Sequence, residues 1–201
     1  MAARSSRAEL PGLVEHAPAE LIAFRQTDYD MPFWARDNSF AARWNAAGDP
    51  PTQYWSLHPD GAWAEHLRQE EVVDEATAAL VRRTIWTCRV PRGTFVDLRD
   101  PATCATHGID AAALTAPDWG PCQALAARLR ADGCPGVLSP CAALDGHTNL
   151  TIFGAKRAID WQRRPALRSQ VPAAVVAVGS PPVGLVRRVA EHPPRSARPT
   201  S

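Results

Sequence analysis

The chain has 201 residues, a formal net charge of +1, and hydrophobic and charged fractions of 45% and 21%. These values fit one globular domain with tails, and they exclude general disorder, a multi-domain assembly and attraction to nucleic acid or membranes through overall charge. No apolar run approaches the roughly 20 residues of a membrane-spanning helix, and the amino terminus lacks the apolar segment of a secretory signal.

Composition divides the chain into four stretches. Residues 1–19 contain Ala, Arg, Glu and Pro without a strong period, so we expect a loose leader. Region 20–162 carries the regular patterns and is the expected folded domain. Region 163–190 is rich in proline but contains two short apolar segments, which predict a strand pair. The last residues, 191–201, cannot bury enough apolar surface to offset ordering and are expected to be disordered.

Apolar residues recur with a helical period in some segments and read as strands in others. A helix is expected over 60–72, with Asp60 as its N-cap, and a second over 120–133, with Gly133 at its end. Because helices and strands interleave without a regular βαβ repeat, the fold class is α+β, with small mixed or antiparallel sheets and flanking helices. The other expected elements are a helical segment at 75–83 and strands at 21–26, 52–57, 83–91, 93–100, 136–140, 149–154, 173–179 and 183–189.

The cysteines do not form a disulfide or zinc pattern. Their number is odd and no C-x-x-C pair occurs, so we expect reduced, partly buried thiols and a cytoplasmic protein. His58 and His66 are eight residues apart and lack a helical partner histidine, so no metal site is expected. The five cysteines are Cys88, Cys104, Cys122, Cys134 and Cys141.

The sequence contains no glycine-rich phosphate loop, no G-x-S-x-G and no H-E-x-x-H motif. Instead, arginines, aromatic residues and one carboxylate gather between residues 24 and 65. Arg25 and Arg43 suit a pyrophosphate, Tyr54 and a tryptophan suit a planar heterocycle, and Glu65 suits positive charge developing on a ribose carbon. By residue type alone, each also has an ordinary structural explanation as a surface or core residue.

In this order the residues resemble the RES domain, a family named for a recurring arginine, glutamate and serine. The match runs through Phe24–Arg25, Ala42–Arg43–Trp44–Asn45 with Gly48, Tyr54, and the A-x-x-E of Ala62–Glu65. Downstream, the chain resembles the family's L-D-L strand, its D-[WY]-S-x-x-Q helix start and its late turn with closing strand, here Val96–Asp100, Asp118–Gln123, and GVLSPCAA followed by NLTIF.

The resemblance implies a fold similar to ADP-ribosylating toxins and an enzyme that consumes NAD+. It implies cleavage of the nicotinamide–ribose bond, with water or inorganic phosphate as acceptor, NAD+ as substrate and no prosthetic group. It also implies a toxin paired with an Xre-like antitoxin protein, without direct binding of nucleic acid or membrane. The implied catalytic residues are Glu65, Arg25 and Tyr54, and the implied dinucleotide-binding residues are Arg43, Trp44, Asn45, Gly120, Gln123 and Ser139.

Three family positions differ here. The serine at the helix start is Gly120, the serine often found in the late turn is Cys141, and the glycine before R-W-N is Ala42. Ser139 lies close enough in sequence to substitute for a lost hydroxyl. The resemblance therefore leaves three hypotheses: an NAD+-cleaving enzyme, a degenerate RES domain that binds antitoxin or nucleotide without turnover, and an ADP-ribosyltransferase that modifies a protein.

Overall fold

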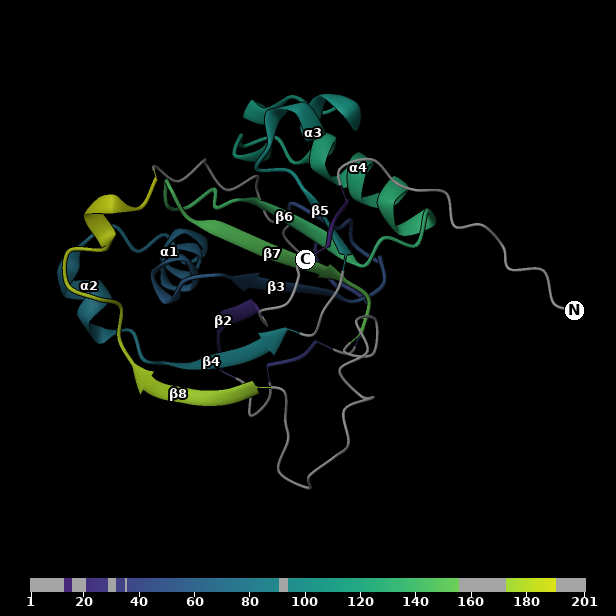
Figure 1. Ribbon diagram of the computed structural model, residues 1–201. Coiled ribbons are helices and arrows are strands. Elements are labelled where there is room, and N and C mark those ends of the chain that lie inside the picture. Colours follow the sequence, from purple (N-terminus) through teal and green to yellow (C-terminus); the bar gives the residue numbers. More distant parts are fainter. Residues whose placement is uncertain are drawn as a thin grey trace, which may run out of the picture.

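The structure, a computed structural model, describes residues 13–15, 21–28, 32–34, 36–90, 94–155 and 173–190. Its strands form one eight-stranded sheet in the order β1-β5-β6-β7-β3-β2-β4-β8 (Figure 1). Among these strands β5 and β6 run parallel and the other neighbours run antiparallel. The predicted α+β class with flanking helices is confirmed, and the strands join in a single mixed sheet.

The helices form two groups, α1 with α2 and α3 with α4 (Figure 1). In chain order the elements are β1 (Leu13–Glu15), β2 (Leu21–Thr27), β3 (Thr52–Ser56), α1 (Pro59–Gln69), α2 (Glu75–Leu80), β4 (Arg83–Val90), β5 (Thr94–Asp97), α3 (Pro101–Thr106), η1 (Ala111–Leu114), α4 (Gly120–Ala131), β6 (Gly136–Pro140), β7 (Thr148–Phe153), β8 (Ala173–Gly179) and η3 (Val186–Arg188).

Helix α1 begins earlier than its sequence pattern suggests. His58, not Asp60, is the N-cap, and its Nδ1 accepts a hydrogen bond of 3.1 Å from the backbone N–H of Asp60. Pro59 takes the first helical position, where a missing N–H costs no helical hydrogen bond. The imidazole of His58 therefore caps the helix, in place of the Asp60 carboxylate predicted from the sequence.

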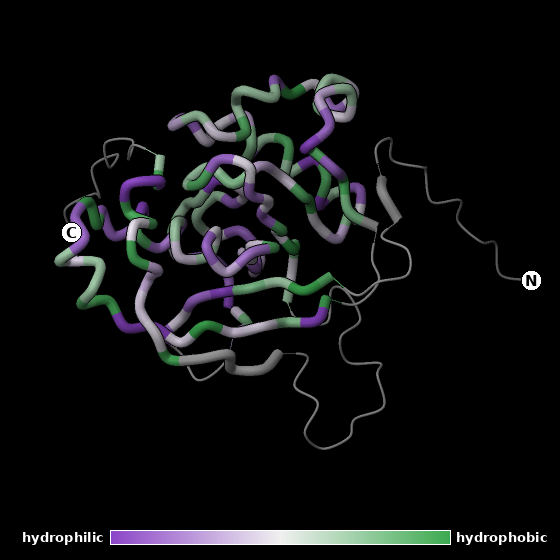
Figure 2. Tube along the Cα trace, turned by 60° about the vertical axis from the view of Figure 1, so that its left-hand side comes forward, coloured by the Kyte–Doolittle hydropathy of each residue, from purple (hydrophilic) through white to green (hydrophobic). Residues whose placement is uncertain are grey.

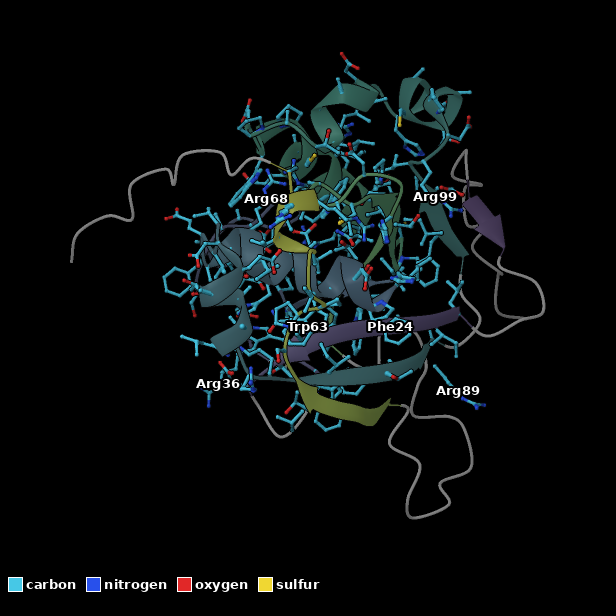
Figure 3. The ribbon with its side chains drawn as sticks, turned by 90° about the vertical axis from the view of Figure 1, so that its left-hand side faces the viewer. Phe24, Arg36, Trp63, Arg68, Arg89 and Arg99 are labelled. Carbon is cyan, nitrogen blue, oxygen red and sulfur yellow. The ribbon has the colours of Figure 1, made fainter. Side chains whose placement is uncertain are left out.

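Strand register separates the two faces of the sheet. Phe24 pairs with Ser56, and Tyr54 pairs with Thr151, so these side chains share the face that α1 and α4 cover. There Leu125 and Leu129 of α4 pack on the sheet, and Trp63 of α1 belongs to the cluster that Phe24 packs against (Figure 3).

The opposite face carries a second apolar cluster from several strands. Trp55, Trp86, Leu138, Leu150 and Ile152 are all buried within it. Short hydrophobic and hydrophilic stretches follow one another along the tube in Figure 2, as expected for elements with one face in a core. The sheet is thus apolar on both faces.

The carboxy-terminal prediction of a strand pair is half right. Ala173–Gly179 forms β8 at the edge of the sheet, but 183–189 forms a turn and the short helix η3. Gly184 adopts a positive φ of 82°, which breaks an extended path, and Leu185 and Val186 pack into the cluster under α1. The predicted disordered tail, 191–201, lies outside the described residues.

The sequence analysis also missed small elements. Leu13–Glu15, within the expected leader, pairs as β1 with β5, and α3 and η1 fill the connection between β5 and α4. The rest of the leader lies outside the described residues.

All five cysteines are free and buried, as predicted. In the part of the chain that the structure describes, none of the helices has the length and apolar character needed to cross a bilayer.

Gly136 provides a test of the β6–β7 register. A Cβ at this position would lie 2.1 Å from the carbonyl oxygen of Thr151, a backbone atom that cannot move without disturbing the ladder. We expect Gly136→Ala to lower the free energy of unfolding by about 1–3 kcal/mol, measured by urea denaturation. Gly179→Ala is the control, because its Cβ meets no atom of the described residues within 4 Å. Equal stability of the two variants would contradict this packing.

Candidate functional site

The carboxylate of Glu65 is held between helix and sheet. Glu65 lies in α1 and is half-buried. Its Oε1 accepts hydrogen bonds from Nδ2 of Asn149, at 2.7 Å, and from the thiol of Cys141, at 3.3 Å. Asn149 belongs to β7, and Cys141 directly follows β6. Two donors from adjoining parts of the sheet therefore fix one oxygen of the carboxylate.

Cys141 acts in this contact as a protonated donor. Burial and, to a lesser extent, the nearby negative charge of Glu65 raise the pKa of its thiol to about 12. The thiol therefore keeps its proton near neutral pH and donates a hydrogen bond to Glu65. The resemblance aligns Cys141 with a position where the RES family often has a serine, and a thiol is a weaker donor than a hydroxyl.

Arg68 lies one helical turn after Glu65 and was missed by sequence reasoning. Its Nη1 donates to the carbonyl oxygen of Ala142, next to Cys141. Burial lowers the pKa of the Arg68 guanidinium, the negative charge of Glu65 raises it, and the positive charge of Arg43 lowers it. Arg68 is therefore close enough to feel both charged groups.

Arg43 approaches the same place from the loop before β3. Its Nη1 donates to the carbonyl oxygen of Ala116, at 2.8 Å, and its guanidinium also makes a hydrogen bond with the sulfur of Cys122. Two guanidiniums and one carboxylate leave a local excess of positive charge. Because a guanidinium has five donors, this pair suits an anion such as a phosphate or pyrophosphate.

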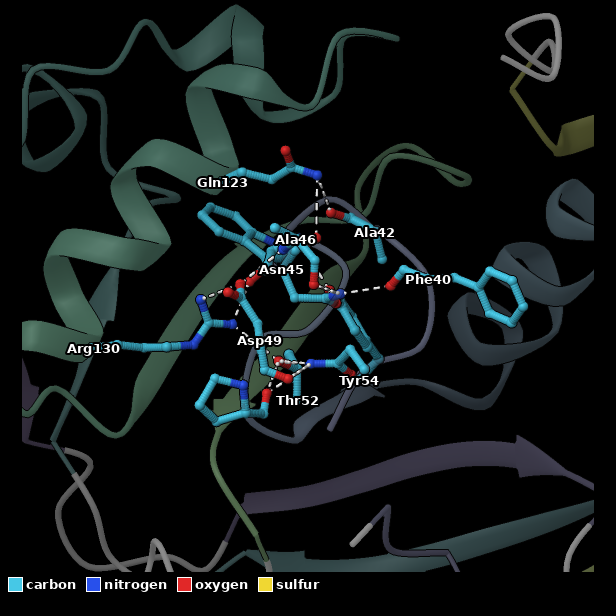
Figure 4. Close-up of polar contacts among 12 residues, drawn as sticks. Phe40, Ala42, Asn45, Ala46, Asp49, Thr52, Tyr54, Gln123 and Arg130 are labelled. Atoms are coloured by element: carbon cyan, nitrogen blue, oxygen red, sulfur yellow. Dashed lines mark hydrogen bonds and ion pairs between the residues drawn. The ribbon is translucent and has the colours of Figure 1, made fainter. Parts of the chain in front are cut away.

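The loop that carries Arg43 is clasped to the sheet and to α4 (Figure 4). The Tyr54 hydroxyl donates to Oδ1 of Asn45, at 2.6 Å, and accepts from the backbone N–H of Trp44, at 3.1 Å. Nε2 of Gln123 donates to the carbonyl oxygens of Ala42 and Asn45, at 2.9 and 3.1 Å. Burial raises the pKa of the Tyr54 hydroxyl far above its ordinary value, so it stays protonated.

Most of the residues predicted to contact a dinucleotide hold this loop in place. The Trp44 side chain is 2% exposed and packs in the cluster under α4, and Asn45 is 1% exposed. Trp44, Asn45, Tyr54 and Gln123 together hold the loop in the geometry that presents Arg43. Their predicted contacts with a dinucleotide remain predictions.

Arg130 is a second anchor that the sequence analysis missed. From α4 it donates to the carbonyl oxygen of Trp44 and to Oγ1 of Thr52, and it pairs with Asp49 at 3.3 Å. Its guanidinium lies 4.4 Å from the centre of the Phe153 ring. A charged residue in a helical pattern usually indicates a solvent-exposed position, so nothing in the sequence indicated that Arg130 anchors the loop.

Arg25, another predicted site residue, lies apart from Glu65. Arg25 pairs with Trp86 in the β2–β4 ladder, which puts its side chain on the face opposite Tyr54. There it donates to the Pro32 carbonyl and to Oε1 of Gln53. The structure thus does not bring Arg25 to the Glu65 cluster.

Gly120 and Ser139 occupy contrasting positions. Gly120 is exposed at the start of α4, and its N–H donates to the Asp118 carboxylate at 2.9 Å, so that carboxylate already takes the donor expected to meet an anion. Ser139 is 2% exposed in β6 and pairs with Asn149, so it shares a face with the residue that holds Glu65.

Comparison with known proteins agrees with the resemblance. A curated protein of Mycobacterium tuberculosis named "Probable NAD(+) phosphorylase" is 35% identical over 112 residues, which make up 55% of this chain and 52% of the relative. The match therefore spans about half the length of that relative. The crystal structure of the M. tuberculosis MbcT–MbcA toxin–antitoxin complex contains the same fold, with a TM-score of 0.63, 20% identity and coverage of 84% of this chain and 86% of that one.

The family itself is settled by a match along most of the sequence. The RES domain family matches residues 19–173, close to the predicted domain at 20–162. That span holds Glu65, Arg68 and Arg43 together with the residues that position them. The protein belongs to the RES domain family.

Proposed function

We propose that this protein binds NAD+ and breaks its nicotinamide–ribose bond, with inorganic phosphate or water as the acceptor. One observation carries the proposal: a carboxylate, Glu65, is fixed by Asn149 and Cys141 beside two arginines, Arg43 and Arg68. The name of the M. tuberculosis relative supports the same chemistry.

The residue types suit each part of this reaction. When the nicotinamide–ribose bond breaks, its electron pair goes to the pyridinium nitrogen and positive charge develops on the ribose carbon. The Glu65 carboxylate would stabilise that charge. Arg43 and Arg68 would hold the pyrophosphate, and an oxygen of phosphate or water would form the new bond to the ribose carbon and lose its proton.

Ribose hydroxyls would find acceptors on the same face of the sheet. Within the described residues, Oδ1 of Asn149 and Oγ1 of Thr151 are buried and lack a hydrogen-bond partner. Buried polar atoms are usually satisfied, so these two atoms are good candidates for contact with a substrate hydroxyl. We further propose an Xre-like antitoxin as the protein partner, because the structural neighbour is a toxin in complex with its antitoxin.

Glu65→Gln tests the central residue. The amide keeps an oxygen that can accept from Asn149 but loses the negative charge, so we expect nicotinamide release to fall about 100-fold or more. Release from NAD+ by the purified chain should be followed with and without phosphate, which also separates a phosphorylase from a glycohydrolase. Glu70→Gln is the matched control, because Glu70 is exposed at the end of the same helix. Unchanged release by a folded Glu65→Gln protein would refute the assignment.

Arg68→Gln and Arg43→Gln test the proposed phosphate contacts. A hydrogen bond to a charged group contributes about 1.5–3 kcal/mol, so each variant should raise the KM for NAD+ by about 10- to 100-fold. Arg128→Gln removes the same charge from an exposed position on α4, where Nη2 donates to the His107 carbonyl, and should leave KM unchanged. A KM that responds equally in all three variants would point to general charge effects instead.

A second candidate function is a RES domain that binds nucleotide or antitoxin without turnover. It is favoured by Gly120, which supplies no hydroxyl and whose N–H is taken by Asp118.

Gly120→Ser distinguishes the two functions. The new Cβ would lie 3.2 Å from Oδ1 of Asp118, an exposed side chain that can give way. If the missing hydroxyl limits the reaction, we expect a rise in nicotinamide release of about tenfold or more. No release by either the parent or the serine variant, with NAD+ binding intact, would favour the binding function.

A further inference from the structure

Two histidines and an aspartate lie together at the start of α1, apart from the Glu65 contacts. His58, Asp60 and His147 each offer one ligand atom, and these atoms lie within 4.8 Å of one another. His58 and Asp60 belong to the first turn of α1, and His147 lies in the turn between β6 and β7. The two imidazole rings meet edge to face, with centroids 5.1 Å apart.

A backbone carbonyl sets the tautomer of His147. Nδ1 of His147 lies 3.0 Å from the carbonyl oxygen of Asp145. A carbonyl only accepts, so Nδ1 carries the proton and the neutral ring has its lone pair on Nε2. Metal-binding histidines commonly donate their second ring N–H in this way, which orients the ring and leaves the other nitrogen for the ion.

His58 and Asp60 complete the ligand set with small movements. Nδ1 of His58 lies 3.9 Å from Oδ1 of Asp60, and the His58 side chain is 54% exposed and so has room to turn. Ligand atoms of a tetrahedral zinc site lie about 3.3 Å apart, given metal–ligand distances of about 2.0–2.1 Å. Rotation of the exposed ring can close this difference, with the ion replacing the Asp60 N–H as partner of the Nδ1 lone pair.

Two features of the same place oppose a cation. The amino-terminal end of α1 carries the positive end of the helix dipole, and Nη1 of Arg188 lies 3.6 Å from Oδ2 of Asp60. Mg²⁺ is a hard ion that prefers oxygen ligands, so it gains little from imidazole nitrogens. Two imidazoles and one carboxylate favour an ion of borderline softness, and the Arg188 side chain, 56% exposed, is able to move aside.

We propose that His58, Asp60 and His147 form a binding site for a divalent transition-metal ion, with Zn²⁺ as the best match. Such an ion joins the first turn of α1 to the β6–β7 turn. Helix α1 carries Glu65, and the β6–β7 turn is flanked by Cys141 and Asn149, so the ion fastens together the two segments that hold the carboxylate. The sequence analysis expected no metal site because it considered only His58 and His66 as a pair. It did not consider His147, which lies close to His58 in the structure.

Calorimetric titration of the untagged, metal-stripped full chain with Zn²⁺ tests the proposal. We expect one ion per chain and a thermal midpoint that rises with Zn²⁺ and not with Mg²⁺. His147→Ala and Asp60→Asn should each weaken Zn²⁺ binding by at least about tenfold. His58→Asn should do the same, and because asparagine is itself a good N-cap, this variant retains the start of the helix.

Two further variants make the test specific. His107→Ala removes a histidine at the end of α3 and should leave Zn²⁺ affinity unchanged. Arg188→Gln removes the competing partner of Asp60 and should tighten binding. The proposal fails if His147→Ala binds Zn²⁺ as the parent does, or if His107→Ala loses affinity to the same extent. If one variant does not fold, the remaining two ligand variants decide.

Discussion

The hydrogen bond from Asn149 to Glu65 ties the chemistry of this protein to its sheet. A half-buried carboxylate on a helix is stable in one orientation only if donors hold it there, because burial without partners is costly. Asn149 supplies that donor from β7, a strand bonded to β6 on one side and β3 on the other. The position of Glu65 therefore depends on the register of the sheet, which Gly136 permits by allowing β6 to pass close to β7.

A second buried network does for Arg43 what Asn149 does for Glu65. Tyr54, Asn45 and Gln123 satisfy one another and the backbone of the loop, so the loop is held by hydrogen bonds that water does not reach easily. Such networks fix a unique conformation when every member is satisfied. Within the R-W-N element, Trp44 and Asn45 are buried, whereas Arg43 is half-buried and donates to the carbonyl oxygen of Ala116.

The sequence predicted the elements well, whereas the contacts that hold the candidate site together became visible only in the structure. Sequence patterns located α1, α4 and most strands within a few residues, because the helices have one apolar face and the strands are short apolar runs between turn residues. It misassigned 183–189 because an apolar run around a glycine can be a strand or a packed turn. The resemblance to the RES domain pointed to Arg43 and Glu65, but Arg68 and Asn149 look like ordinary surface and strand residues. Asn149 of β7 meets Glu65 of α1, and Arg68 of α1 meets Ala142 in the turn after β6, so both contacts join segments that are distant in sequence. Arg25 is a further example. The sequence motif that contains it does not indicate which face of the sheet its side chain occupies, and in the structure that face is the one opposite Tyr54.

Replacement of a family serine by Cys141 is compatible with a working carboxylate because the two donors to Glu65 are unequal. Asn149 donates through an amide N–H, at 2.7 Å, whereas Cys141 donates through a thiol, at 3.3 Å, and a thiol is the weaker kind of donor. Burial keeps that thiol protonated, so it never becomes a second negative charge beside Glu65. In the proposed reaction, a weaker donor leaves more negative charge on Oε1 to stabilise the cation that develops on the substrate. Cys141 therefore still holds Glu65 in place by a hydrogen bond, and it leaves the negative charge on the Glu65 carboxylate.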